Sequence, residues 1–383
     1  MPHRLPTLVE MLEGLISTPS ISSVSPEFDQ SNRPVIELLG SWLSDLGFSV
    51  EILPLASQPH KANLIATRGS GPSGLVLAGH TDTVPYDEGR WQHDPFSLTE
   101  DGGRFYGLGT SDMKGFFALV LQAALKFRDT PLAQPLVVLA TADEESSMDG
   151  AKALVSMGRP QARYAVIGEP TGMVPVNAHK GILMEAIHVI GRSGHSSDPA
   201  LGRSALEGMH RVVAEILSWR SELQGRHRDP AFKVPMPTLN LGHIHGGDNP
   251  NRICAECELH IDLRPLPGMT LDELRRDLRE RVTHALVDSE LKVEVRSLID
   301  GTEPMHTPLE SDLVRACEGL TGHRAEAAAY CTEGPYLNAL GMDTIILGPG
   351  DIACAHQPDE YMPTANVRPM VGMLEKLIER FCV

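Results

Sequence analysis

Histidine and acidic residues follow several apolar runs of this sequence, at positions where their side chains could bind metal ions. The candidates are His80 and Asp82 in GHTD, Asp112 in SDMKG, Glu144 and Glu145 in TADEESS, Glu169 in GEPT and His356 in CAHQPDE. Taken singly, each could be an ordinary solvated or hydrogen-bonded side chain. Together they offer the imidazole nitrogens and carboxylate oxygens that bind zinc and neighbouring divalent metals, so the set predicts a site for two such ions.

The acidic run at residues 143–145 requires a positive charge nearby. Asp143, Glu144 and Glu145 are consecutive and follow the apolar run PLVVLA. Two like charges 4 Å apart repel by about 4 kcal/mol at an effective dielectric constant of 20, so we expect these acids to face metal. Asp82 lies two residues after His80, on the same face of an extended chain. We expect its carboxylate to orient the imidazole ring of His80.

Short apolar runs alternating with helical stretches would position these side chains. GLVLAGH, PLVVLATADEE, YAVIGEPT and the late DTIILGPG lack polar alternation, and MKGFFALVLQAALKF is a helix pattern. Such runs predict a largely parallel sheet covered by helices, which binds ligands at the carboxyl ends of its strands. The candidate ligands come at or beyond those ends. Asp112 instead begins the helix, where the helix dipole favours a carboxylate.

Residues 181–299 follow a different pattern. The partly alternating strands ILMEAIHVI, TLNLGHIHG, CELHIDLRP and LKVEVRSL are interrupted by helices near 203–223 and 271–287. Alternation indicates a sheet with one solvated face. We therefore predict an α/β catalytic domain of residues 1–180 and 300–383, with an inserted α+β domain of β-α-β-β-α-β order at 181–299. Thr270 and Glu273 predict a capping box for the second inserted helix.

Length, charge and cysteine content narrow the possible classes of protein. The 383 residues carry a formal net charge of −17 without a cluster of Lys and Arg, which disfavours nucleic acid as a partner. No apolar run approaches the roughly 18 residues of a membrane span, and the N-terminus lacks the long apolar core of a signal peptide. Six cysteines without framework spacing fit a reducing compartment. We expect a soluble cytoplasmic protein with no membrane partner.

Rival interpretations find less support. Gly107 and Gly109 begin a glycine pattern typical of nucleotide-binding loops, but Asp112 replaces the third glycine and would repel phosphates. The chain has neither the G-x-S-x-G of serine hydrolases nor an H-E-x-x-H motif. Cys254 and Cys257 form a C-x-x-C, yet residues three apart on a strand point to opposite faces. A redox or zinc role for that pair is therefore disfavoured.

Six motifs in chain order resemble those of one family, the dinuclear zinc deacylases and peptidases. They are GHTDTVP (79–85), GLGTSDMKG (107–115), ATADEE (140–145), GEPT (168–171), GRSGHSSDP (191–199) and AHQPDE (355–360). The resemblance covers nearly the whole chain. It implies a metal-dependent amide hydrolase whose catalytic domain is interrupted by a lid that pairs two subunits into a homodimer. A non-catalytic scaffold that retained only the fold would not require all of these residues.

The resemblance also implies a role for each residue. Two zinc ions, for which cobalt can substitute, would be held by His80 and Glu169 at one ion, by Glu145 and His356 at the other, and by Asp112 between them. Glu144 would be the general base that takes a proton from water, so that a metal-bridging hydroxide attacks the acyl carbonyl. His195 would reach from the lid into the active site of the other subunit and stabilise the oxyanion.

The expected substrate is a small N-acylated amino acid. Its α-carboxylate calls for Arg264, because a guanidinium binds a carboxylate with two parallel hydrogen bonds, with Asn251 as helper and Arg252 as the weaker candidate. EFDQSNRP, TLNLGHIHGGDNPNRICAECELHIDLRPLPGMTL and YCTEGPYL are most similar to the branch that deacetylates N-acetylornithine in arginine biosynthesis. If the substrate is N-acetylornithine, Glu333 would bind its δ-ammonium group. Branches that remove succinyl groups, or that accept acylated amino acids broadly, stay open.

Overall fold

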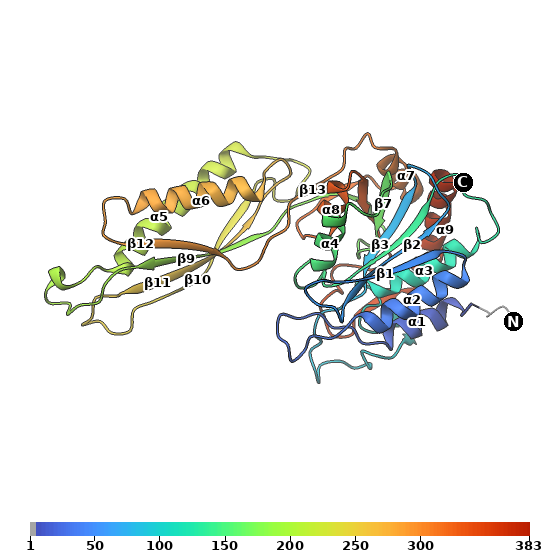
Figure 1. Cartoon of the computed structure of the whole chain (residues 1–383), viewed down its shortest axis with the longest axis horizontal. Coiled ribbons are helices and arrows are strands. Elements are labelled where there is room, and N and C mark those ends of the chain that lie inside the picture. Colours follow the sequence, from blue (N-terminus) through green and yellow to red (C-terminus); the bar gives the residue numbers. More distant parts are fainter. Residues whose placement is uncertain (1–4) are drawn as a thin grey trace. The chain divides into compact units, whose positions relative to one another are not determined.

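The computed structural model describes residues 5–383, which form two compact units (Figure 1). The first unit contains the described residues up to Asn177, together with His306–Glu326 and Thr332–Val383. The second contains Ala178–Met305 and the short segment Ala327–Cys331. The sequence analysis placed the boundaries at 180 and 300 and did not indicate that short segment. Within residues 5–383, no helix has both the length and the apolar character needed to cross a membrane.

A mixed sheet has the strand order β1-β2-β6-β3-β7-β15-β8, to which the short strands β13 and β14 add beside β8; its strands belong to the first unit, except that β8, β13 and β14 contain the chain divisions between the units. The strands are β1 (Ser49–Pro54), β2 (Ala62–Arg68), β3 (Leu75–His80), β6 (Leu136–Thr141), β7 (Tyr164–Ile167), β8 (Val176–His179), β13 (Met305–His306), β14 (Glu326–Ala328) and β15 (Asp343–Ile346). Strand β3 runs parallel to β6 and β7, and β15 runs parallel to β7. The outer strands β1, β2 and β8 pair antiparallel. A largely parallel centre is what the sequence predicted.

The central strands are buried along their whole length, and helices cover the sheet. Every residue of β3, β6 and β7 is buried, which explains why these strands appear as unbroken apolar runs in the sequence. The helices of this unit are α1 (Leu8–Ile16), α2 (Arg33–Asp45), α3 (Lys114–Leu125), α4 (Asp149–Met157), α7 (Asp312–Thr321), α8 (Gly334–Ala339) and α9 (Thr364–Cys382). Helices α3 and α9 pack together and against β3, α2 packs on β1 and β2, and α4 packs against α8.

A small antiparallel sheet in the same unit joins two distant parts of the chain. It consists of β4 (Thr99–Asp101), β5 (Arg104–Tyr106) and β16 (Tyr361–Pro363), with β5 in the middle. Just beyond this pairing, the backbone N–H of Gly107 donates to the carbonyl oxygen of Glu360 at 3.1 Å. The loop before β16 is therefore fixed beside the loop that leads into α3.

The second unit is an antiparallel sheet with two helices. Its sheet has the order β10-β11-β9-β12, and its elements along the chain are β9 (Leu183–Ile190), the 3₁₀ turn Pro199–Leu201, α5 (Ala205–Arg226), β10 (Thr238–Gly246), β11 (Glu256–Arg264), α6 (Leu271–Ala285) and β12 (Lys292–Ser297). This order confirms the predicted β-α-β-β-α-β fold class. Apolar side chains such as Met209, Trp219 and Leu278 of the helices pack with those of one sheet face into the core of this unit.

The predicted capping box at the start of α6 is wrong. Thr270 is the N-cap residue, but its side chain makes no capping hydrogen bond. The backbone N–H of Leu271 instead donates to the carboxylate of Glu303 at 3.1 Å. An acid from a distant turn thus satisfies a free N–H at the helix start, which is electrostatically favoured by the helix dipole.

Candidate metal centre

The structure brings the predicted ligands of the first unit together. His80 is the last residue of β3, Glu144 and Glu145 follow β6, Glu169 follows β7, Asp112 precedes α3, and His356 lies in the loop after β15. Because β3, β6, β7 and β15 belong to the parallel part of the sheet, their carboxyl ends meet at one edge. Most of this cluster is buried: His80 is 1% exposed, and Asp112 and Glu169 are 7% and 6% exposed.

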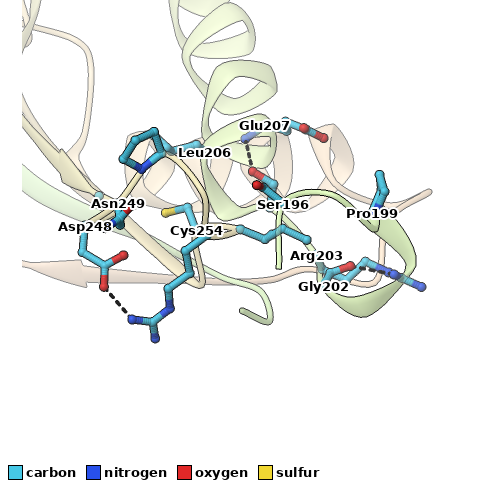
Figure 2. Close-up of a pocket in the computed structure, with 15 residues that line it drawn as sticks. Ser196, Pro199, Gly202, Arg203, Leu206, Glu207, Asp248, Asn249 and Cys254 are labelled. Carbon is cyan, nitrogen blue, oxygen red and sulfur yellow. Dashed lines mark hydrogen bonds and ion pairs between the residues drawn. The ribbon is translucent and has the colours of Figure 1, made fainter. Parts of the chain in front are cut away.

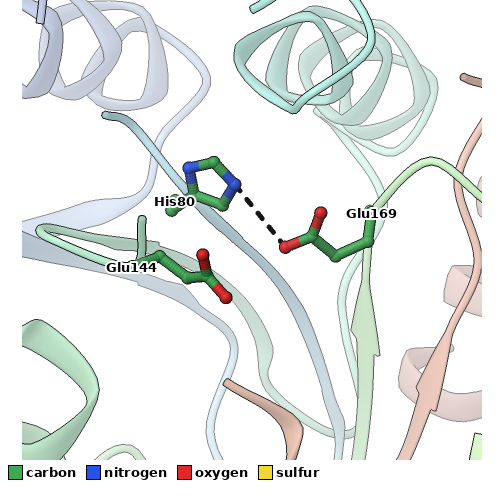
Figure 3. Close-up of side chains that lie close together, drawn as sticks. All are labelled: His80, Glu144 and Glu169. Carbon is green, nitrogen blue, oxygen red and sulfur yellow. Dashed lines mark ion pairs between the residues drawn. The ribbon is translucent and has the colours of Figure 1, made fainter. Parts of the chain in front are cut away.

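Asp112 lies between the two histidines. Its Oδ1 is 3.1 Å from Nε2 of His80, and its Oδ2 is 3.4 Å from Nε2 of His356. His80 Nε2 also lies 3.5 Å from Oε1 of Glu169 (Figure 3). His356 Nε2 lies 3.1 Å from Oε1 of Glu145. This arrangement makes two groups that share one carboxylate, as expected for ligands of two neighbouring ions.

Further distances support a metal centre over a set of ordinary ion pairs. One potential ligand atom from each of His80, Glu144 and Glu169 lies within 4.8 Å of the others, and the same holds for His80, Asp112 and Glu145. In Figure 3, the side chains of Glu144 and Glu169 approach His80 from two different strand ends. Nitrogen and oxygen donors at such separations fit divalent cations, and more than one carboxylate is available for each imidazole.

Burial and mutual repulsion decide the protonation of this cluster. Burial raises the pKa of Glu144 and of Glu169, and the charges of nearby carboxylates raise both further. Burial works against the charged form of His80, but Glu169 and Asp112 outweigh it and raise its pKa well above the usual value. Hydrogen bonds to Asp112 and Glu145 raise the pKa of His356 to about 10. The cluster thus holds more negative charge than its own imidazoles neutralise, and divalent cations would satisfy it.

Asp82 contacts His80 differently from the expected carboxylate–imidazole pair. Nδ1 of His80 is 3.0 Å from the backbone carbonyl oxygen of Asp82 and 3.7 Å from its carboxylate Oδ1. The other carboxylate oxygen accepts the backbone N–H of Glu145 at 3.1 Å. Burial raises the pKa of Asp82 to about 6. Asp82 therefore ties the histidine of one predicted ion to the backbone of a ligand of the other.

The expectation that all three adjacent acids face metal is wrong for Asp143. Its Oδ1 lies 2.5 Å from Nζ of Lys61, and both side chains are almost fully buried. The backbone of Asp143 has a φ of 58°, in the left-handed region, and turns the chain sharply after β6. Asp143 therefore points to a lysine, while Glu144 and Glu145 point to the ligand cluster.

Glu360 is a residue whose place the sequence did not reveal. It is 1% exposed, and its carboxylate accepts backbone N–H groups from Gly109 at 3.1 Å, Ser111 at 2.8 Å and Asp112 at 3.0 Å. These contacts fix the loop that presents Asp112 to both histidines. Glu360 stands in the AHQPDE motif, but only the pairing of β16 with β5 brings it to this loop.

Glu333 is hydrogen-bonded to the end of β6, the strand that precedes Glu144. It precedes α8 and is 1% exposed; its Oε2 accepts a hydrogen bond from Oγ1 of Thr141 at 2.7 Å. Its Oε1 is buried and, among the described residues, has no hydrogen-bond partner. Burial raises the pKa of Glu333 to about 7. A buried carboxylate with one free oxygen is costly unless a ligand or a proton satisfies it.

The remaining predicted residues belong to the second unit. Ser196, next to His195, donates its backbone N–H to the carbonyl oxygen of Asn251 at 3.0 Å, so the loops carrying His195 and Asn251 are neighbours. Both loops line a pocket of about 700 Å³ with Arg203 at its side (Figure 2). Arg264 ends β11. Its Nε donates to Asp262 at 2.9 Å, and its terminal nitrogens have no hydrogen-bond partner among the described residues.

Arg252 is engaged in an ion pair with Asp248, a residue labelled in Figure 2. Its NH1 lies 2.6 Å from Oδ2 of Asp248, and both side chains are more than half exposed. Cys254 lines the same pocket, and Cys257 lies on β11; both are buried free thiols. The roles of His195, Asn251 and Arg264 toward a substrate stay predictions.

A largely parallel sheet with imidazole and carboxylate side chains at its carboxyl edge, interrupted by an antiparallel unit, is typical of metal-dependent hydrolases with an α/β catalytic domain. The chain belongs to peptidase family M20/M25/M40, whose family model matches residues 76–380. It is 49% identical over 382 residues to "Acetylornithine deacetylase" of Edwardsiella ictaluri (strain 93-146), covering 100% of both chains. The family predicted from the motifs is thus confirmed, and the chain is a metal-dependent amide hydrolase.

Solved structures share the fold at low sequence identity. The M20 family metallo-carboxypeptidase Sso-CP2 from Sulfolobus solfataricus matches with a TM-score of 0.74 at 17% identity, over 98% of this chain and 99% of that one. The Bacillus subtilis YXEP protein, a dinuclear metal binding peptidase from the M20 family, matches with a TM-score of 0.68 at 14% identity, over 97% of both chains. These likenesses confirm the predicted fold class.

Proposed function

We propose that this protein hydrolyses N2-acetyl-L-ornithine to L-ornithine and acetate, a step of arginine biosynthesis. The observation that carries this proposal is the 49% identity, along the whole chain, to a relative named acetylornithine deacetylase. Because the match covers the full length of both chains, the relative has sequence corresponding to both units of this protein. The ligand cluster supports the proposal, since all the predicted ligands and the predicted base lie close together in it.

Two divalent ions, which we propose to be zinc with cobalt as a substitute, would be held by His80 and Glu169, by Glu145 and His356, and by Asp112 between them. When bound, such ions polarise an acyl carbonyl and lower the pKa of water. Asp82 and Glu360 hold the backbone of two of these ligands, at Glu145 and at Asp112. The chain thereby fixes the ligands before a substrate arrives.

Glu144 carries the proton in this reaction. Its carboxylate faces the same space as His80 and Glu169, and burial raises its pKa. It takes a proton from water as the water oxygen bonds to the acyl carbon, and it returns that proton to the amine nitrogen when the C–N bond breaks. Glu145 does not replace it, because its Oε1 is held 3.1 Å from His356.

His195 donates a hydrogen bond to the oxyanion that forms on the acyl group. The backbone N–H of Ser197 donates to Nδ1 of His195 at 3.2 Å. Nδ1 therefore accepts a hydrogen bond within the loop, which leaves Nε2 as the nitrogen that can donate to a substrate. We propose that two subunits pair through their second units, and that His195 of one subunit serves the metal centre of the other.

Arg264, Asn251 and Glu333 select the amino acid. The terminal nitrogens of Arg264 have no partner in the described chain and match the α-carboxylate, with Asn251 as an additional donor. Glu333 meets the δ-ammonium of ornithine with the oxygen that lacks a partner. We place the enzyme in the cytoplasm, which agrees with six free cysteines.

A direct assay tests this function. Zinc- or cobalt-loaded protein is incubated with N2-acetyl-L-ornithine and, separately, with N-succinyl-diaminopimelate, and the free amine is quantified. Release from acetylornithine alone is the expected result. Release from the succinylated substrate alone would assign the chain to the desuccinylase branch, and release from neither, with two metals bound, would refute both substrates but not the hydrolase.

A further inference from the structure

A buried ion pair holds Asp143, the residue that immediately precedes the two glutamates of the cluster. Lys61 immediately precedes β2, and its side chain is 3% exposed. Its Nζ lies 2.5 Å from Oδ1 of Asp143 and 2.6 Å from Oδ1 of Asp29. Oγ of Ser22 also donates to Oδ1 of Asp143 at 2.8 Å, and Nε2 of Gln58 donates to its Oδ2 at 3.1 Å. Both oxygens of Asp143 are thus engaged away from the metal cluster.

The backbone of Asp143 determines where the next two residues point. Its φ of 58° is unusual for a residue other than glycine, and such a conformation persists only where surrounding contacts hold it. Its carbonyl oxygen accepts the backbone N–H groups of Ser147 at 3.1 Å and Met148 at 2.6 Å, which closes a tight turn. Glu144 and Glu145 lie inside this turn. Their direction therefore depends on the conformation of Asp143.

We infer that Lys61 is a positioning residue of the metal centre. Its ammonium holds the carboxylate of Asp143, and Asp143 in turn holds the turn that aims Glu144 and Glu145 into the cluster. Among the described residues, the side chain of Lys61 makes no hydrogen bond or ion pair with either glutamate. The inference rests on the proposed function only in assigning a metal ligand and a base to these two glutamates.

Asp29 provides a matched comparison within the same ion-pair network. It shares the ammonium of Lys61 with Asp143, and its Oδ1 also accepts the backbone N–H of Ser23 at 3.0 Å. It lies in the segment before α2 and reaches the glutamate turn only through other residues: through Lys61, and through the segment of Ser23, whose neighbour Ser22 bonds Asp143. A role of Lys61 in stability alone would make the two acids equivalent. A positioning role makes Asp143 the important one.

The test compares Asp143→Asn with Asp29→Asn, two isosteric changes, by titrating the metal-free proteins with Co²⁺ and recording visible absorption. Asparagine tolerates the left-handed backbone, so the first variant removes the charge and not the turn preference. We expect Asp143→Asn to weaken Co²⁺ binding at one or both positions by about tenfold or more, the size of effect that residues supporting metal ligands have. Asp29→Asn should stay within about twofold of the parent. Equal losses in both variants, or none in Asp143→Asn, would overturn the inference.

Lys61→Met adds a direct test, with Arg275→Met as its control. Arg275 makes a comparable pair in the second unit: its Nε lies 2.9 Å from Oε1 of Glu185, whose side chain is fully buried. Both variants should lower Tm, but only Lys61→Met should change the Co²⁺ titration. If Lys61→Met does not fold, the two aspartate variants decide. The Co²⁺ titration needs no substrate. Inactivity on acetylornithine would therefore refute the proposed function, while the metal titration alone would still decide the inference about Lys61.

Discussion

The metal centre and the loop around His195 are built in different ways. In the metal centre, contacts join residues far apart in the chain: His80 meets Asp112 across 32 positions, and His356 meets Glu145 across 211. In the second unit, the side chain of His195 contacts Ser197, only two positions away, while the backbone of its loop pairs with that of residues 251–253. The ligand side chains of the first site therefore meet only in the completed fold, whereas the side chain of His195 is held within its own loop.

Burial differs between most residues of the two regions. His80 is 1% exposed, whereas His356 and the loop of His195 are exposed to solvent. A change in the metal centre disturbs several charged neighbours at once, because each ligand faces at least one other. A change in the second unit removes one side chain and little else. Substitutions should accordingly alter metal content only in the first region, and rate or substrate affinity in either.

The largest effect is expected inside the metal centre, where adjacent glutamates have different roles. Glu144→Ala should keep both metal ions and lower kcat by about 10³-fold, within the range that general acid–base catalysis contributes. Glu145→Ala should lose one metal ion, because it removes the carboxylate beside His356. Metal analysis by mass spectrometry combined with kcat decides. Equal metal loss in the two variants would contradict the division of roles.

The matching change in the second unit is His195→Ala. Loss of one oxyanion donor should lower kcat by about 10²-fold while both metals stay bound. Another exposed histidine of this unit, His284 on α6, serves as control, and His284→Ala should leave kcat unchanged. A metal deficit in His195→Ala would mean that the two regions are less separate than their contacts indicate.

The sequence predicted much of the metal centre because parallel strands bring their carboxyl ends to one edge. His80 and Glu169 could be placed from the apolar runs before them. The direction of Asp143 could not, since it depends on a left-handed turn and on Lys61, which is distant in sequence. Glu360 was missed for a similar reason: the pairing of β16 with β5 that brings it to Asp112 has no local pattern. Sequence reasoning thus indicates candidate ligands and misses the groups that hold them.

Glu333 can be tested by comparing two substrates, one with a charged side chain and one without. Glu333→Gln should lower kcat/KM for N2-acetyl-L-ornithine by about tenfold or more, as expected for a lost hydrogen bond between charged groups. For N-acetyl-L-methionine, whose side chain is uncharged, the loss should be small. The ratio of the two kcat/KM values is the measurement. Equal losses on both substrates would show that Glu333 supports the site without reading the side chain.

Arg264 should act on substrate affinity. Arg264→Lys keeps the charge but loses the fork that matches a carboxylate, so KM for N2-acetyl-L-ornithine should rise by about tenfold with kcat changed less. The same variant should show no such rise for the carboxamide of the substrate, which lacks the α-carboxylate. A fall in kcat with unchanged KM would place Arg264 away from the bound substrate.

Arg252 should have the smallest effect, although it lies close to His195 in the fold. Its ion pair with Asp248 joins two side chains that are 54% and 61% exposed, and exposed pairs contribute about 0–1 kcal/mol. Arg252→Ala should therefore change kcat, KM and Tm little, with kcat and KM each within about twofold of the parent. A rise in KM comparable to that of Arg264→Lys would show that Arg252 leaves Asp248 to bind the substrate carboxylate. In that case the Arg252–Asp248 ion pair would exist only in the free enzyme and would break when substrate binds. The second unit would then rearrange on binding, unlike the metal centre, whose ligands are already in place.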